Sequence, residues 1–105
     1  MKQDRQVVFV PESLRQFETL KKYAQAIVED GIDEHLIQND PTVETSMKFK
    51  LRRASPHADY ELKIEPWRIF YRVEEYTRER AKVKITLIGE KRGNKLIVEG
   101  KEFQL

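Results

Sequence analysis

The sequence predicts one α+β domain: an N-terminal strand, one or two helices, and then a twisted, mainly antiparallel sheet of four to five strands that the helices cover on one face. Three observations favour this fold. A chain of 105 residues suits a single hydrophobic core. Apolar residues recur at helical spacing over 14–28 and at alternate positions in several segments after residue 47. No repeat or Pro- and Gly-rich linker divides residues 1–105.

The N-terminal half predicts a strand and then helices. Residues 6–10 are rich in β-branched and aromatic side chains and stop at Pro11, which predicts an opening strand. The helical spacing that follows predicts an amphipathic helix ending near Gly31. Residues 32–37 are expected to form a short second helix that closes before the Asn39-Asp40-Pro41 turn. The periodic residues are Leu14, Phe17, Leu20, Ala24, Ile27 and Val28.

The C-terminal half predicts an antiparallel meander with strands at 47–53, 59–65, 67–74 and 81–88. Pro66 and Trp67 are expected at the two central positions of the turn between the second and third of these strands. That register places Lys63 opposite Phe70. Because side chains alternate between faces, one face becomes apolar and the other charged and open to solvent. The apolar face comprises Tyr60, Leu62, Ile64, Ile69, Tyr71, Val73, Val83, Ile85 and Leu87.

Composition excludes several classes of protein. The chain has no cysteine, which excludes a disulfide scaffold, a cysteine zinc site and a thiol nucleophile, and permits a reducing cytoplasm. Its apolar runs are too short for a membrane span or a signal peptide, so we expect a cytoplasmic protein without a membrane partner. Nucleotide-binding glycine motifs and the HExxH metal motif are absent, and only His35 and His57 are present. We therefore expect no metal and no cofactor.

Charge is distributed unevenly along the chain. Residues 1–47 carry a net charge of −4, residues 48–95 carry +7 and residues 96–105 carry −1. A block of basic residues favours a polyanionic partner such as nucleic acid. The alternative, that the charges only keep an exposed sheet face soluble, remains open. The basic residues on or beside the predicted charged face are Lys50, Arg52, Arg53, Lys63, Arg68, Arg72, Lys82, Lys84, Lys91 and Arg92.

A cluster of cations on a sheet has a defined chemistry. When the 2′-hydroxyl of RNA attacks the adjacent phosphate, charge builds on the phosphoryl oxygens, and nearby cations stabilise it. A lysine among other cations has a lowered pKa and can serve as a base. The sequence is therefore compatible with RNA cleavage that needs no metal.

The residues of the two longest predicted strands carry a family resemblance. The run DYELKIEPWRIFYRV over 59–73, followed by VKITLIGEKR over 83–92, resembles the RelE/ParE superfamily of bacterial toxin-antitoxin toxins. The order of strand, helices and antiparallel sheet matches that fold, so the resemblance covers most of the chain. In the RelE branch it implies ribosome-dependent cleavage of messenger RNA and neutralisation by a cognate antitoxin protein.

The resemblance also implies roles for individual residues. Arg68 falls on an arginine that contacts phosphate, Lys63 on a basic residue that acts as base or charge stabiliser, and either Lys91 or Arg92 on the basic residue that ends the fourth strand. Glu61 stands where the family has a second basic residue, and residues 93–105 lack the family's C-terminal tyrosine. Six further residues are predicted to bind RNA: Lys50, Arg52, Arg53, Phe70, Arg72 and Lys84.

Two alternatives remain open at this stage. The first is a non-cleaving member of the same fold, either a ParE-like inhibitor of DNA gyrase or a catalytically silent protein that binds an antitoxin or nucleic acid. The second concerns Phe70, whose ring is expected on the basic side, where it either stacks on a base or packs on a cross-strand neighbour. The sequence makes no prediction of the oligomeric state.

Overall fold

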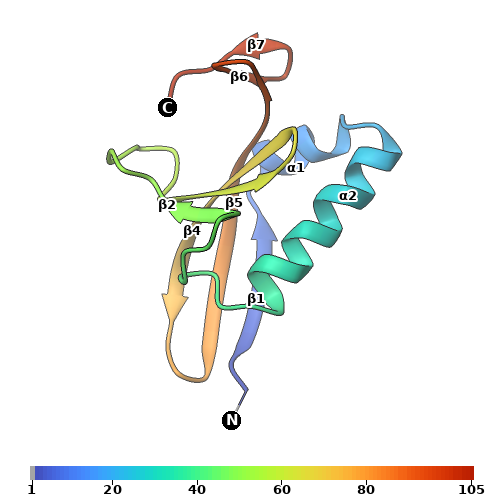
Figure 1. The fold of residues 1–105 in the computed structure, drawn as a ribbon. Coiled ribbons are helices and arrows are strands. Elements are labelled where there is room, and N and C mark those ends of the chain that lie inside the picture. The colour runs from blue at the N-terminus through green and yellow to red at the C-terminus, as the bar shows by residue number, and fades with distance from the viewer. Residues whose placement is uncertain (1) are drawn as a thin grey trace.

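One long strand, β5 (Arg80–Arg92), organises the sheet in the computed structural model, which describes residues 2–105 (Figure 1). Along one side β5 pairs with antiparallel β4 (Trp67–Tyr76), and β3 (Tyr60–Ile64) and β2 (Lys48–Lys50) follow outward. On its other side β5 pairs in parallel with β1 (Asp4–Phe9) and, near its end, in antiparallel fashion with β6 (Lys95–Val98). A short β7 (Lys101–Glu102) completes a sheet of seven strands. The predicted α+β class and element order are confirmed, with two more strands than expected.

The predicted first helix is two helices. α1 (Pro11–Glu18) ends at Thr19, and α2 (Lys22–Ile32) continues directly into one π-helical segment, η1 (Asp33–Ile37). α2 thus ends one residue beyond Gly31, close to the predicted end, and η1 corresponds to the short second helix predicted over residues 32–37. Because the two segments are continuous, Gly31 lies within helical backbone. A Cβ at Gly31 would lie 2.5 Å from Cδ1 of Ile64, so glycine allows α2 to lie close against β3.

α1 completes the edge of β5 in the gap between β1 and β6. β1 pairs with β5 only as far as Ile85, and β6 begins to pair at Glu90. In the gap, Ser13 Oγ donates a hydrogen bond of 2.6 Å to the Ile85 carbonyl, and the Ile88 amide donates one of 2.8 Å to Gln16 Oε1. Both polar side chains are buried. The Ile85 carbonyl also accepts a hydrogen bond from the Val10 amide at 3.1 Å, so Ser13 adds a second bond there, whereas Gln16 supplies a side-chain partner for the Ile88 amide.

The apolar face of the sheet forms the main core beneath α2 and η1 (Figure 1). The prediction of this face holds for β3, β4 and the first half of β5. It was wrong for Leu87, because β5 has a bulge at Thr86: Leu87 pairs with Phe70, whereas Tyr71 pairs with Ile85. The extra residue moves Leu87 to the opposite face, and Ile88 takes its place in the core. The buried members of the main core are Ala24, Val28, Ile32, Leu36, Leu62, Trp67, Ile69, Tyr71, Val83, Ile85 and Ile88.

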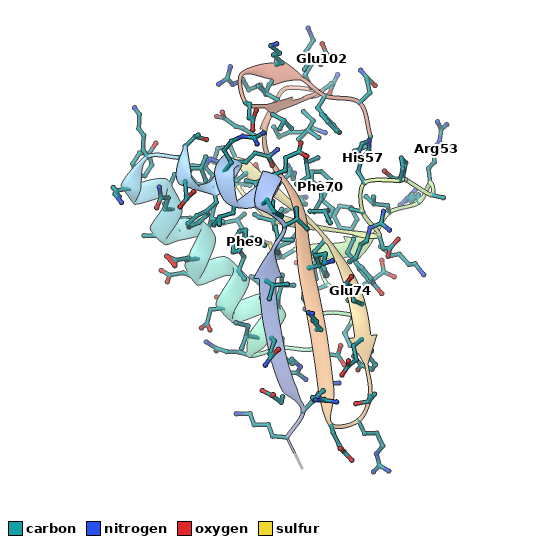
Figure 2. All side chains as sticks on the ribbon, turned by 180° about the vertical axis from the view of Figure 1, so that it is seen from behind. Phe9, Arg53, His57, Phe70, Glu74 and Glu102 are labelled. Carbon is teal, nitrogen blue, oxygen red and sulfur yellow. The ribbon has the colours of Figure 1, made fainter. Side chains whose placement is uncertain are left out.

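A second core covers the middle of the opposite face, which was predicted to be open. Phe70 and Leu87 are 1% and 3% exposed there, beneath side chains of the loop before β3 and of the C-terminal strands. In Figure 2, Phe70 lies between the long strands and the C-terminal hairpin that carries Glu102. Gly89 permits this cover, because a Cβ there would lie 2.8 Å from Leu96 Cδ1. The second core comprises Ala58, Phe70, Leu87, Leu96 and Val98, with Leu51 and Phe103 packed against them.

The hairpin between β3 and β4 has a different register from the one predicted. Ile64 pairs with Trp67 and Lys63 with Arg68, so the central turn residues are Glu65 and Pro66. The predicted pairing of Lys63 with Phe70 was therefore wrong by two residues. Because side chains alternate with a period of two, this shift leaves every side chain on its predicted face.

No helix within residues 2–105 is long and apolar enough to cross a membrane.

Candidate active site

Four charged side chains gather where β3, β4 and β5 meet, on the sheet face opposite the helices. We call Glu61, Lys63, Arg68 and Lys91 the Glu61 cluster. Lys63 and Arg68 are direct cross-strand partners, and Arg68 in turn pairs with Gly89 of β5. Lys91 lies two residues beyond Gly89 and so returns to the same face. The strand pairing thus brings together residues that are 30 positions apart in the chain.

Arg68 is the centre of this cluster and is almost fully buried. Its Nε lies 3.1 Å from Glu61 Oε2, one guanidinium nitrogen lies 3.0 Å from Glu65 Oε1, and another donates to the Trp67 carbonyl at 3.1 Å. The side chain is only 9% exposed. Arg68 therefore faces two carboxylates and a carbonyl, which leaves it poorly placed for the predicted phosphate contact. Its role in this structure is to position Glu61 and the turn.

Glu61 is a carboxylate with an unusual environment. Its side chain is 16% exposed. Burial raises the pKa of Glu61, and this effect outweighs the opposite influence of Arg68, Lys91 and Lys63. A carboxylate with a raised pKa accepts a proton more readily than an ordinary glutamate. Glu61 replaces the cation that the family resemblance predicts, and the structure places it among cations that compensate its charge.

Lys63 and Lys91 are the cations of the cluster that form no ion pair among the residues the structure describes. Lys63 is partly exposed and Lys91 exposed, so each ammonium can meet an anionic ligand. The structure also distinguishes Lys91 from Arg92, which the sequence could not do. Arg92 pairs with Glu90 at 3.1 Å and, by alternation, lies on the other face. Lys91 therefore belongs to the cluster, and Arg92 does not.

The six predicted RNA-binding residues fall into two groups. Phe70 is buried in the second core, so its ring has no face free to stack on a base, and that prediction was wrong. Arg72 donates a hydrogen bond to the Pro56 carbonyl, and Lys84 pairs with Glu74 at 2.9 Å. The other three are exposed on β2 and the loop that follows it, where Figure 2 shows Arg53 pointing away from the sheet. These three are Lys50, Arg52 and Arg53. Lys50 pairs with Tyr60, whose side chain packs against the main core, so Lys50 lies on the helix side of the sheet and its prediction as part of the charged face was wrong.

The charged face is thus divided rather than continuous. The second core separates the Glu61 cluster, at one end, from Arg72 and Lys84, at the other. Sequence reasoning missed this division because its cause is remote: β6 and the segment through Phe103 fold back over the sheet. The one local signal was Gly89, a residue without a side chain in the middle of a strand.

The remaining chemistry of the surface is limited. No group of three or more histidine and carboxylate side chains within residues 2–105 is arranged to hold a metal ion. His57, on the loop before β3, stacks edge-on against Phe103 with 4.9 Å between ring centroids. His35 lies 3.7 Å from Glu34 on η1. The Glu61 cluster is therefore the strongest candidate for acid–base or anion chemistry on the charged face.

Comparison with known proteins adds no further assignment. No protein-family model matches the chain, and no curated protein matches it. The fold and the Glu61 cluster together carry the functional argument.

Proposed function

We propose that this chain is a RelE-like toxin of a type II toxin-antitoxin system, an endoribonuclease that cleaves messenger RNA on the ribosome without a metal. The observation that carries the proposal is that Lys63 and Lys91, which form no ion pair within residues 2–105, act on the largely buried Glu61 on one sheet face. The proposal implies cytoplasmic action and a cognate antitoxin protein as partner. The strand motifs over 59–73 and 83–92 support the same assignment.

The Glu61 cluster offers the groups that this reaction requires. Glu61, with its raised pKa, would accept the proton of the attacking 2′-hydroxyl. Lys63 and Lys91 would stabilise the charge that develops on the phosphoryl oxygens. Arg68 would hold Glu61 in place through their 3.1 Å ion pair. The exposed cations Arg52 and Arg53, on the loop after β2, would bind the RNA backbone.

The test is induced expression in a bacterial host without a partner protein, with growth and the ends of messenger RNA followed in the same culture. Wild-type protein should arrest growth and produce cuts at ribosome-occupied codons. Glu61→Gln and Lys63→Ala should each reduce the cutting rate about 10²-fold or more, since general acid–base and electrostatic contributions have that size. Lys22→Ala, an exposed lysine on α2, is the matched control. Undiminished cutting by both cluster variants would remove the cluster from the mechanism.

A second candidate function is a non-cleaving protein of the same fold. It is favoured by the burial of Arg68 between Glu61 and Glu65 and by the absence of tyrosine from residues 93–105. Growth arrest without RNA cuts, but with signs of DNA damage, would identify DNA gyrase as the target. Full soluble expression without arrest would indicate a silent protein that binds an antitoxin or nucleic acid.

A further inference from the structure

A second feature with chemical potential lies away from the Glu61 cluster, on the helix-covered side of the sheet. There η1, the loop before β2 and the first residue of β2 enclose a groove of about 440 Å³. This volume lies within the usual range of small-molecule sites. Glu34, His35 and Asp40 line the groove together with Ser46 and Lys48.

Lys48 is the unusual member of this lining. It pairs with Leu62, whose side chain belongs to the main core, and it is only 2% exposed. Its amine forms no ion pair and no hydrogen bond with any residue from 2 to 105. Yet no fully buried polar side-chain atom in this part of the chain lacks a partner. The Lys48 amine therefore keeps a small contact with solvent. The groove is an open space that Lys48 lines.

Burial favours the neutral form of the Lys48 amine. Burial is the largest influence and lowers the pKa of Lys48; Arg5 of β1 lowers it further, whereas Asp40 raises it. Asp40 opposes the shift, and its carboxylate also accepts hydrogen bonds from Tyr76 and from the backbone and hydroxyl of Thr42. A lysine with a lowered pKa carries more free amine at neutral pH, and the free amine is the nucleophilic form.

We propose that this groove is a binding site for small, uncharged, hydroxylated carbonyl compounds, which Lys48 captures as an imine. The free amine attacks the carbonyl carbon and one of its protons passes to the oxygen, which gives a carbinolamine; the second nitrogen proton then leaves with the hydroxyl group as water, and the C=N bond forms. His35 and Ser46 offer hydrogen-bonding groups for the hydroxyls of the ligand. Glu34 and Asp40 disfavour an anionic ligand, which is why the proposed class is uncharged. The proposal stands independently of the proposed function.

The test uses the intact wild-type chain with glycolaldehyde, a neutral hydroxylated aldehyde, and cyanoborohydride to reduce any imine as it forms. Mass spectrometry of peptides then gives the labelling rate of each lysine. Lys50 is the internal control, because it lies on the same strand but is exposed. Each unit by which a lysine pKa falls gives about ten times more free amine near neutral pH, so Lys48 should be labelled several-fold faster than Lys50. Slower labelling of Lys48 than of Lys50 in the folded protein would overturn the proposal.

Two further arms test the groove and the charge preference. Ser46→Trp places a large side chain at the exposed rim and should reduce labelling of Lys48 without changing that of Lys50. An unchanged rate at Lys48 would exclude the groove as the site of capture. Glyoxylate, an anionic aldehyde, should give a lower ratio of Lys48 to Lys50 labelling than glycolaldehyde does. An equal ratio would overturn the preference for uncharged ligands.

Discussion

Arg68 and Glu61 lie on adjacent strands and form an ion pair with 3.1 Å between Nε and Oε2, although each side chain is less than one-fifth exposed. Glu65, in the turn, adds a second carboxylate: its Oε1 lies 3.0 Å from the same guanidinium, but its side chain is 66% exposed. The inner pair therefore carries most of the structural effect. It fixes the position of the one carboxylate whose pKa is raised on this face.

Arg68→Ala should consequently destabilise the fold. Removing one partner of a buried pair leaves the other charge without compensation, at a cost of about 3–5 kcal/mol when burial is complete. Glu61 keeps some solvent and two neighbouring lysines, so we expect about 2 kcal/mol. Urea unfolding measures the change. Arg80→Ala, which breaks an exposed pair with Glu75, should change the free energy of unfolding by less than about 1 kcal/mol. Equal losses in both variants would contradict the structural role of Arg68.

The expected loss of stability in Arg68→Ala complicates activity measurements on that variant. A loss of toxicity in Arg68→Ala would follow from partial unfolding as well as from a lost catalytic contact. Lys63 and Lys91 form no ion pair within residues 2–105, so their replacement should leave the fold intact. Growth and RNA-end measurements on these two lysines therefore report on chemistry more directly than measurements on Arg68 do.

Much of the fold followed from alternation along strands. The apolar and charged faces of β3 and β4 were predicted correctly, even though the turn register was wrong by two residues, because a shift of two preserves the face of each side chain. The bulge at Thr86 could not be predicted in this way. A bulge depends on the pairing of two strands, and Thr86 has no local signal that distinguishes it from its neighbours.

The candidate site was predicted less completely than the fold. The motif identified Lys63 and Arg68, and alternation placed both on one face. The ion pairs that occupy Arg68 depend on the true turn register, which sets Lys63 rather than Glu65 opposite Arg68. Burial of Phe70 depends on β6 and β7, strands of four and two residues, which are too short for their periodicity to be recognised.

Gln16→Met should destabilise the protein through the edge of β5. The amide oxygen of Gln16 accepts the Ile88 N–H at 2.8 Å in a buried position, and methionine has a similar length but offers only a weak acceptor. An unsatisfied buried amide costs about 1–3 kcal/mol. Thermal or urea unfolding gives the change, and hydrogen exchange should show faster exchange at Ile88. Gln104→Met, at an exposed position, is the control and should have no measurable effect. Unchanged exchange at Ile88 would argue against this bond.

Lys48→Met should change the pH dependence of stability. The pKa of Lys48 is lowered in the folded chain by burial, so between that pKa and the ordinary lysine value of 10.5 the unfolded chain binds more protons. The free energy of unfolding of the wild type should therefore rise with pH through this interval on account of Lys48. The variant lacks this contribution, so it should be more stable than the wild type at neutral pH, with an advantage that shrinks toward pH 10.5. Lys50→Met is exposed and should show no such trend. Urea unfolding at a series of pH values distinguishes the two.

Gly89→Ala should loosen the C-terminal strands from the sheet. The added Cβ would lie 2.8 Å from Leu96 Cδ1 and 2.9 Å from the Ile97 carbonyl oxygen, and the latter is backbone that cannot move without shifting β6. Overpacking of this kind costs about 1–3 kcal/mol. Hydrogen exchange should increase over β6 and around Phe70, while the pairing of β1 with β5 stays protected, because the two strands contact different parts of β5. Adding Leu96→Ala removes the side-chain contact but leaves the contact with the Ile97 carbonyl oxygen. The double variant should therefore recover little of the lost stability. Full recovery would mean that β6 adjusts freely, and the second core would then be a loose cover rather than a fixed part of the fold.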